Sequence, residues 1–160
     1  MALEFRVEKC TYRVQRPMDA FTQFDLIAKV SPLLASGFGE FVPFFIAMRK
    51  EGIAKIGDIP MDRMAKLVGP IARELAKMPT EDRHFVLASC LSICDRKQDG
   101  PTFWAPVWNP QAGRSMFDDI NNDISVMLRI ALAVFQGTFS NFFPASLSGS
   151  TGEARPPISK

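Results

Sequence analysis

Residues 124–143 read ISVMLRIALAVFQGTFSNFF and are apolar over most of their length. A membrane-spanning helix needs about 20 predominantly apolar residues. Here Arg129 interrupts the segment, and Gln136 and the polar residues after it dilute its second half. We therefore expect a helix that is buried in a protein core and runs to about Phe142.

The composition is that of a globular domain able to bury a sizeable core. Of the 160 residues, 47% are hydrophobic and 22% are charged. The formal net charge of +2 is too close to zero to indicate a nucleic-acid-binding protein. Phenylalanine is unusually frequent, with 14 Phe residues beside a single Tyr. Because Phe adds apolar area without a polar group, this surplus favours a surface that only a partner covers.

The three cysteines favour a reducing compartment. Cys10, Cys90 and Cys94 are few and odd in number, whereas secreted disulfide scaffolds carry more cysteines in even numbers. The first six residues lack a basic stretch followed by an apolar one, so we expect no signal peptide. The pattern is typical of a cytosolic protein.

The N-terminal residues alternate between apolar and polar side chains. This period of two predicts a β-hairpin over residues 3–16 with a turn near Lys9. Farther along, residues 103–108 are extended and aromatic, and residues 115–117 could pair back across a loop. A second small hairpin is therefore expected there.

Helical spacing of apolar residues dominates the rest of the chain, and Gly37 and Gly39 are expected to break it. The expected helices cover residues 20–30, 40–50, 61–78, 80–97 and 121–142. Their expected N-caps are Asp19, Thr80, and Asn121 or Asn122. The fold class is thus mainly α, with about five helices. Residues 1–145 are expected to form one domain, and residues 146–160, rich in Ser, Gly and Pro, a disordered tail.

No residue set reads as an active or metal site. Cys90 and Cys94 would share one face of the helix expected over 80–97, but no second ligand pair follows at zinc-site spacing. Two buried core thiols explain them better. His84, the only histidine, has no nucleophile in a recognisable context, so we interpret it as a surface residue.

The acidic residues Asp118, Asp119 and Asp123 are better explained as helix-capping residues than as a cation site. A calcium loop needs regularly spaced oxygen ligands and a closing Glu, which are absent. We therefore expect no catalytic residue, no metal and no cofactor. A small redox protein using Cys90 and Cys94 is the alternative from the enzyme class.

The densest aromatic cluster lies in residues 38–48, and glycines flank this segment on both sides. It is short and apolar on most faces, which favours an exposed patch that meets a partner helix, although core packing is the simpler reading for any one ring. The candidate client-binding residues are Phe38, Phe41, Phe44, Phe45 and Met48.

Seven short segments, in this order, resemble the tail assembly chaperones of long-tailed bacteriophages and prophages. They cover about residues 5–143 and begin with the N-terminal hairpin and Tyr12-Arg13-Val14. The others are FTQFD (21–25) leading to SPLLA (31–35), LAKM (75–78) with Glu81-Asp82, VLASCLS (86–92), WAPV (104–107), MFDDI (116–120) and NFF (141–143).

The resemblance implies a mainly helical chaperone without catalytic residues. Such a protein would keep the hydrophobic, helical tape measure protein soluble in the host cell cytoplasm and recruit tail-tube subunits around it. Its partners would then be those tail proteins, with neither nucleic acid nor membrane, and a homo-oligomer is left open. The alternative function is a structural minor tail component of the virion.

Overall fold

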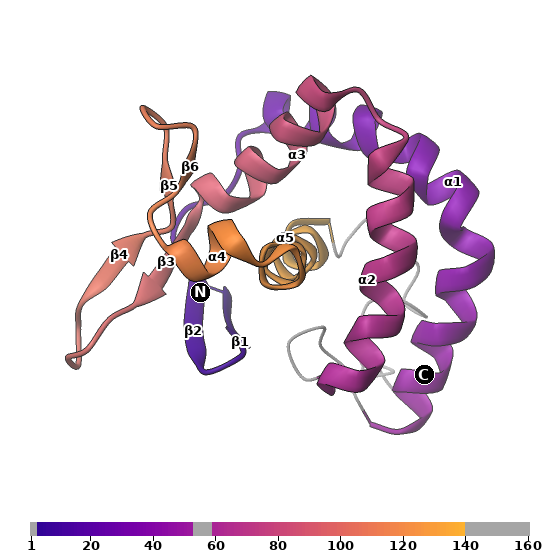
Figure 1. Cartoon of the computed structure of the whole chain (residues 1–160), viewed down its shortest axis with the longest axis horizontal. Coiled ribbons are helices and arrows are strands. Elements are labelled where there is room, and N and C mark those ends of the chain that lie inside the picture. The colour runs from indigo at the N-terminus through magenta and orange to yellow at the C-terminus, as the bar shows by residue number, and fades with distance from the viewer. Residues whose placement is uncertain (1–2, 53–58, 140–160) are drawn as a thin grey trace, which may run out of the picture.

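The computed structural model describes residues 3–52 and 59–139, and for some positions in its first two helices it describes the backbone alone. Figure 1 shows helix α5 in the middle, with a sheet on one side and two long helices on the other. The helices are α1 (Ala20–Lys50), α2 (Met61–Ala76), α3 (Thr80–Ser92), α4 (Asp118–Asn122) and α5 (Ile124–Phe139). The strands are β1 (Leu3–Val7), β2 (Cys10–Val14), β3 (Cys94–Lys97), β4 (Trp104–Pro106), β5 (Trp108–Asn109) and β6 (Arg114–Ser115).

The expected core helix is confirmed. Eight residues of α5 are buried, and α3, α4, β1 and α2 pack around it. Among them, Arg129 is only 4% exposed and forms an ion pair of 2.6 Å with Glu8 in the β1–β2 turn. Among the described residues, no helix is long and apolar enough to cross a membrane.

The expected N-terminal hairpin is present, whereas the second is present only between β5 and β6, because Trp104–Pro106 form β4 and pair with β3 instead. β1 and β2 pair antiparallel with Phe5 opposite Tyr12, and both rings lie in the core. β5 and β6 pair with Trp108 opposite Ser115. The larger sheet, however, has four antiparallel strands in the order β1-β2-β3-β4, so the expected mainly helical class holds only roughly.

The helix expected over residues 80–97 is wrong in its last turn. α3 ends at Ser92, and Cys94–Lys97 form β3 between β2 and β4. Pairing with β2, which lies some eighty residues earlier in the chain, overrides the local helical pattern because tertiary context decides weak local preferences. Arg96 therefore extends from a strand and does not close a helix.

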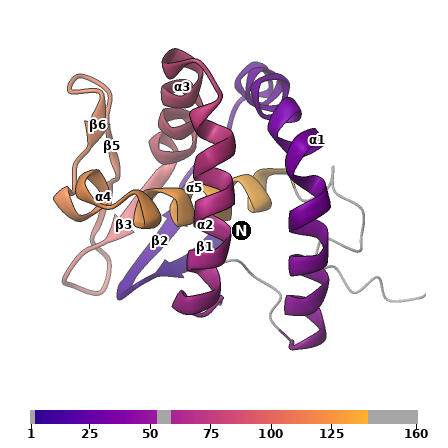
Figure 2. The ribbon, with the colours of Figure 1, turned by 45° about the vertical axis from the view of Figure 1, so that its right-hand side comes forward.

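The break expected at Gly37 and Gly39 is also wrong. α1 is a single helix of 31 residues that includes Pro32 and Pro43, and Figure 2 shows it beside α2. In a helix, Gly costs about 1 kcal/mol and Pro about 3 kcal/mol relative to Ala. Packing of α1 against α2 and α3 offsets these costs. The Gly69-Pro70 step likewise leaves α2 as one helix.

The caps follow the expectation at one helix of three. The Asp19 carboxylate accepts hydrogen bonds from the backbone N–H and the hydroxyl of Thr22, at the start of α1. Thr80 is already the first residue of α3, after Pro79. At α5 the cap is Asp123, which accepts a hydrogen bond of 2.8 Å from the Ser125 N–H. The expected tail over 146–160, and the end of the last helix beyond Phe139, lie outside the described residues.

Candidate client-binding surface

Helix α1 has one face in the core and another in solvent. Leu26 is fully buried and Val30 is 9% exposed, whereas Phe21 is 86% and Phe24 is 73% exposed. Single exposed apolar residues are common, but two neighbouring Phe rings at these exposures form an apolar patch, which makes this face the candidate surface. The exposed apolar residues continue along the same face at helical spacing, and we call them the α1 outer stripe: Phe21, Phe24, Ala28, Pro32 and Ala35.

The N-terminal half of α1 is held firmly to the body of the protein. Lys29 Nζ lies 2.6 Å from Asp82 Oδ1 on α3 and 5.4 Å from the centre of the Phe85 ring. The hydrogen bond to Asp82 raises the pKa of Lys29, which is the direction expected when a cation gains an anionic partner. The α1 outer stripe therefore stands on a helix that is fixed by its opposite face.

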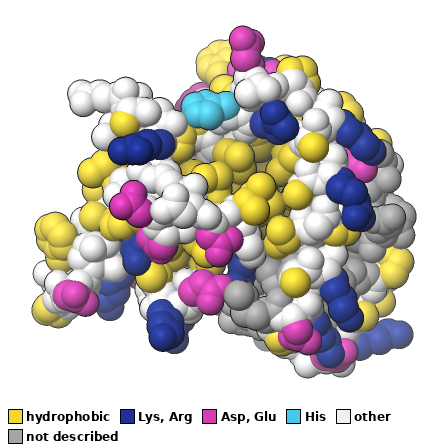
Figure 3. All heavy atoms as spheres, viewed as in Figure 1, with side chains coloured by type: hydrophobic (Ala, Val, Ile, Leu, Met, Phe, Trp, Pro, Cys, Tyr) yellow, Lys and Arg dark blue, Asp and Glu magenta, His cyan; other side chains and the backbone are white. Residues whose placement is uncertain are grey.

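Helix α2 leaves its apolar face only partly covered. Its larger described apolar side chains are half-buried, and none is in the core; we call Val68, Ile71 and Leu75 the α2 stripe. Figure 3 shows hydrophobic side chains gathered in the recessed middle of one face of the molecule, between the helices. Acidic side chains lie over α4 and the start of α5, and basic ones lie over α1 and α2 but also near the β5–β6 hairpin, so neither sign is confined to one side.

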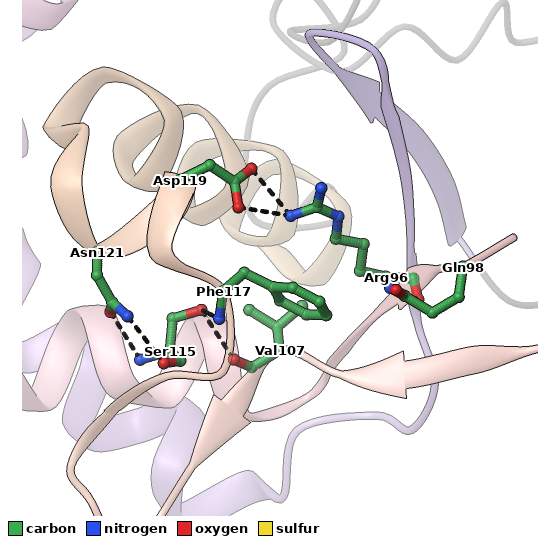
Figure 4. A network of polar contacts seen from close by, with 7 residues as sticks. All are labelled: Arg96, Gln98, Val107, Ser115, Phe117, Asp119 and Asn121. Atoms are coloured by element: carbon green, nitrogen blue, oxygen red, sulfur yellow. Dashed lines mark hydrogen bonds and ion pairs between the residues drawn. The ribbon is translucent and has the colours of Figure 1, made fainter.

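The side of this face that carries α4 is fixed by a polar network, drawn in Figure 4. Arg96 on β3 binds both carboxylate oxygens of Asp119, at 2.7 and 2.9 Å, and its guanidinium lies 4.5 Å from the centre of the Phe117 ring. The Ser115 hydroxyl donates to the Val107 carbonyl.

A side-chain amide completes the network. Asn121 exchanges two hydrogen bonds with the backbone of Ser115, at 3.0 and 2.9 Å. These contacts hold α4 against the sheet, so Asn121 serves β6 and does not cap α5.

The sequence candidates Phe38, Phe41, Phe44, Phe45 and Met48 belong to α1 by their backbone. Their side chains lie outside the part that the structure describes, so this prediction is not tested. What sequence reasoning missed is the exposure of Phe21 and Phe24. The sequence does carry a signal for it, because Leu26 and Val30 form a second apolar series on the other side of the same helix. Only one of the two series can face the core.

The cysteines and the histidine considered above as possible reactive residues make contacts within the fold. Cys90 and Cys94 are each 1% exposed, and the Cys94 thiol donates to the Cys90 carbonyl at 3.4 Å. Burial raises the pKa of Cys90 to about 12, which keeps that thiol protonated and unreactive. His84 is exposed, with Nε2 at 3.2 Å from the Gly113 carbonyl oxygen and its ring edge-on to Trp108. Among the described residues, no group of His, Cys, Asp or Glu is arranged to hold a metal ion.

The described residues thus form a helical body, fixed by buried contacts, whose helices α1 and α2 leave apolar stripes partly or fully exposed. Comparison with protein families supplies the class of protein. The model of the family described as phage tail assembly chaperone protein, TAC, matches residues 9–151, and the chain belongs to this family. Neither the curated proteins nor the solved structures gave a match.

Proposed function

We propose that this tail assembly chaperone binds the tape measure protein of its phage through the α1 outer stripe, with the α2 stripe as a second contact. It keeps that client soluble in the host cell cytoplasm until tail-tube subunits assemble around it. The observation that carries the proposal is the exposure of Phe21 and Phe24, at 86% and 73%. A client helix laid along α1 would cover both rings.

The shape of α1 suits a long helical client. At 1.5 Å per residue, its 31 residues span roughly 46 Å. Covering apolar area contributes about 25 cal/mol per Å², and burying one Phe side chain about 1.5–3 kcal/mol. Two rings then account for a binding contribution of about 3–6 kcal/mol before the entropic cost of association. Because association costs at least about 4 kcal/mol, these two rings alone would not hold a client, and the proposal requires further contacts such as those of the α2 stripe.

The proposal also includes Phe38, Phe41, Phe44, Phe45 and Met48. They lie on the same helix as the α1 outer stripe, so a client helix that follows α1 passes their positions. The triple variant Phe41→Ser, Phe44→Ser, Phe45→Ser should weaken client binding while the chain stays folded. Unfolding of that variant would instead place these three rings in the core.

The experiment is co-expression of the chain with the tape measure protein of the same phage, followed by pull-down and measurement of the soluble client fraction. The test variant is Phe21→Ser with Phe24→Ser. The matched control is Phe103→Ser, because Phe103 is 62% exposed and lies before β4, away from α1. We expect the double variant to lose client binding and solubilisation, and the control to keep both.

Two results would contradict the proposal. One is equal client binding by the wild-type chain and the double variant, which would remove the α1 outer stripe from the site. The other is the presence of this chain at stoichiometric levels in purified particles, which would favour a structural tail component over a chaperone that leaves before completion.

A further inference from the structure

Strand β1 is the outermost strand of the four-stranded sheet, and one of its edges faces away from β2. The turn that closes the hairpin has two residues, with Val7 opposite Cys10. In such a hairpin the closing pair exchanges backbone hydrogen bonds, and bonded pairs then alternate along the ladder. The backbone N–H and C=O groups of Glu4 and Arg6 therefore point outward. Among the described residues, nothing outside the ladder forms a backbone hydrogen bond with either.

The side chains along this edge are complementary to themselves. β1 reads LEFRV, with one acidic and one basic residue placed symmetrically around Phe5. Both charged side chains are exposed, and neither is in an ion pair among the described residues. We propose that β1 is a dimerisation edge, on which a second copy of this chain adds its own β1 antiparallel about a two-fold axis at Phe5.

Charge and backbone geometry together select that register. With Phe5 opposite Phe5 of the second copy, each Glu4 lies opposite an Arg6, and the outward N–H and C=O groups of both residues meet. A shift by two residues in one direction sets Glu4 against Glu4, and in the other direction Arg6 against Arg6. Like charges directly opposite each other destabilise a strand pair, so one register of the three is favoured.

The apolar side of the strand supports the same arrangement. Phe5 and Val7 are buried under the helices, while Leu3, on the same face, remains 36% exposed. In the proposed register Leu3 lies opposite Val7 of the second copy, which extends the apolar layer across the two-fold axis. An exposed strand edge that pairs with its own copy gives a closed, isologous interface. A five-residue edge fits a weak dimer whose population depends on concentration.

The test uses the full chain and charge reversal. Glu4→Arg and Arg6→Glu, made singly, put like charges opposite each other in the homodimer. Each should raise the dimer dissociation constant by about tenfold or more in sedimentation equilibrium. The double exchange, Glu4→Arg with Arg6→Glu, restores opposite charges and should restore the dimer. An equimolar mixture of the two single variants should form a heterodimer, since all its cross-strand pairs are then of opposite sign.

Each result of this experiment either supports or overturns the proposed dimer. Circular dichroism checks that each variant is folded, as expected for substitutions on the exposed side of the strand. A wild-type chain that is monomeric throughout the concentration series would overturn the proposal. So would a dimer that neither single reversal weakens, because its interface would lie elsewhere. The proposal is independent of client binding: a chain that dimerises through β1 but binds no tape measure protein would leave it intact.

Discussion

Tyr12 is the only tyrosine of the chain, and it lies in the core between the sheet and the helices. Its ionisation at high pH therefore reports whether this part of the core stays closed to solvent. Its side chain is fully buried and stacks on Phe5, with ring centres 5.7 Å apart. Its hydroxyl has no hydrogen bond of good geometry within the described part of the chain, and a weaker contact with the Cys10 side chain also favours the neutral phenol. Burial therefore raises the pKa of Tyr12 well above its ordinary value, although the nearby Arg96 guanidinium opposes the shift.

The sign and size of the effect follow from linkage. The folded state favours the neutral phenol, so Tyr12 contributes full stability below its unfolded pKa of about 10 and progressively less as the pH rises above it. Each pH unit above 10 removes about 1.4 kcal/mol until the folded-state pKa is reached. At about pH 11.5 the loss is about 2 kcal/mol, a large part of the 5–15 kcal/mol that stabilises a typical domain.

The assay follows phenolate absorbance and circular dichroism together during an alkaline titration. Because the chain has a single tyrosine, the absorbance reports Tyr12 alone. We expect the phenolate to appear only as the secondary structure is lost. The control is Tyr12→Phe, which keeps the ring and removes a hydroxyl that has no hydrogen bond of good geometry. At pH 7 it should change the free energy of unfolding by less than about 1 kcal/mol.

The variant should also unfold at higher pH than the wild-type chain, because its ring cannot ionise. The reasoning would be refuted by ionisation of Tyr12 near pH 10 in a protein whose circular dichroism is unchanged. That result would mean that solvent reaches the hydroxyl in the folded state.

Two further predictions concern buried groups. In the native protein a thiol reagent at about pH 8 should label Cys10, which is half-buried. It should spare Cys90 and Cys94, because burial raises the pKa of both thiols. All three should react in denaturant, and mass spectrometry counts the labels. Glu8→Gln keeps the shape of the turn but removes the charge that faces the buried Arg129, so thermal unfolding should show a loss of about 1–2 kcal/mol; an unchanged midpoint would show that this ion pair contributes nothing.

Elements set by local pattern could be predicted well. The apolar stretch of α5, the alternation in β1 and β2, and the Asp19 cap each depend on residues close together in sequence. The buried state of Cys90 also followed from its residue type. In these cases the local preference and the final fold agree, so a short stretch of sequence is enough to predict the element.

The two errors in helix bounds share one cause, which is contact between distant segments. Cys94–Lys97 became a strand because β2 and β4 lie on either side of it, and nothing in its own residues requires that. Similarly, α1 continues past two glycines, and its packing against α2 and α3 offsets their cost.

The sequence by itself determined that this chain has one strongly buried helix, an N-terminal hairpin and an unusually high content of Phe. Only the tertiary structure decided which apolar side chains of α1 are buried and which face solvent. Phe21 and Phe24 are as apolar as Leu26 and Val30, so the helical period allows either pair to face inward. The choice depends on where α3 and α5 place the core, and that position is fixed by pairing between residues far apart along the chain.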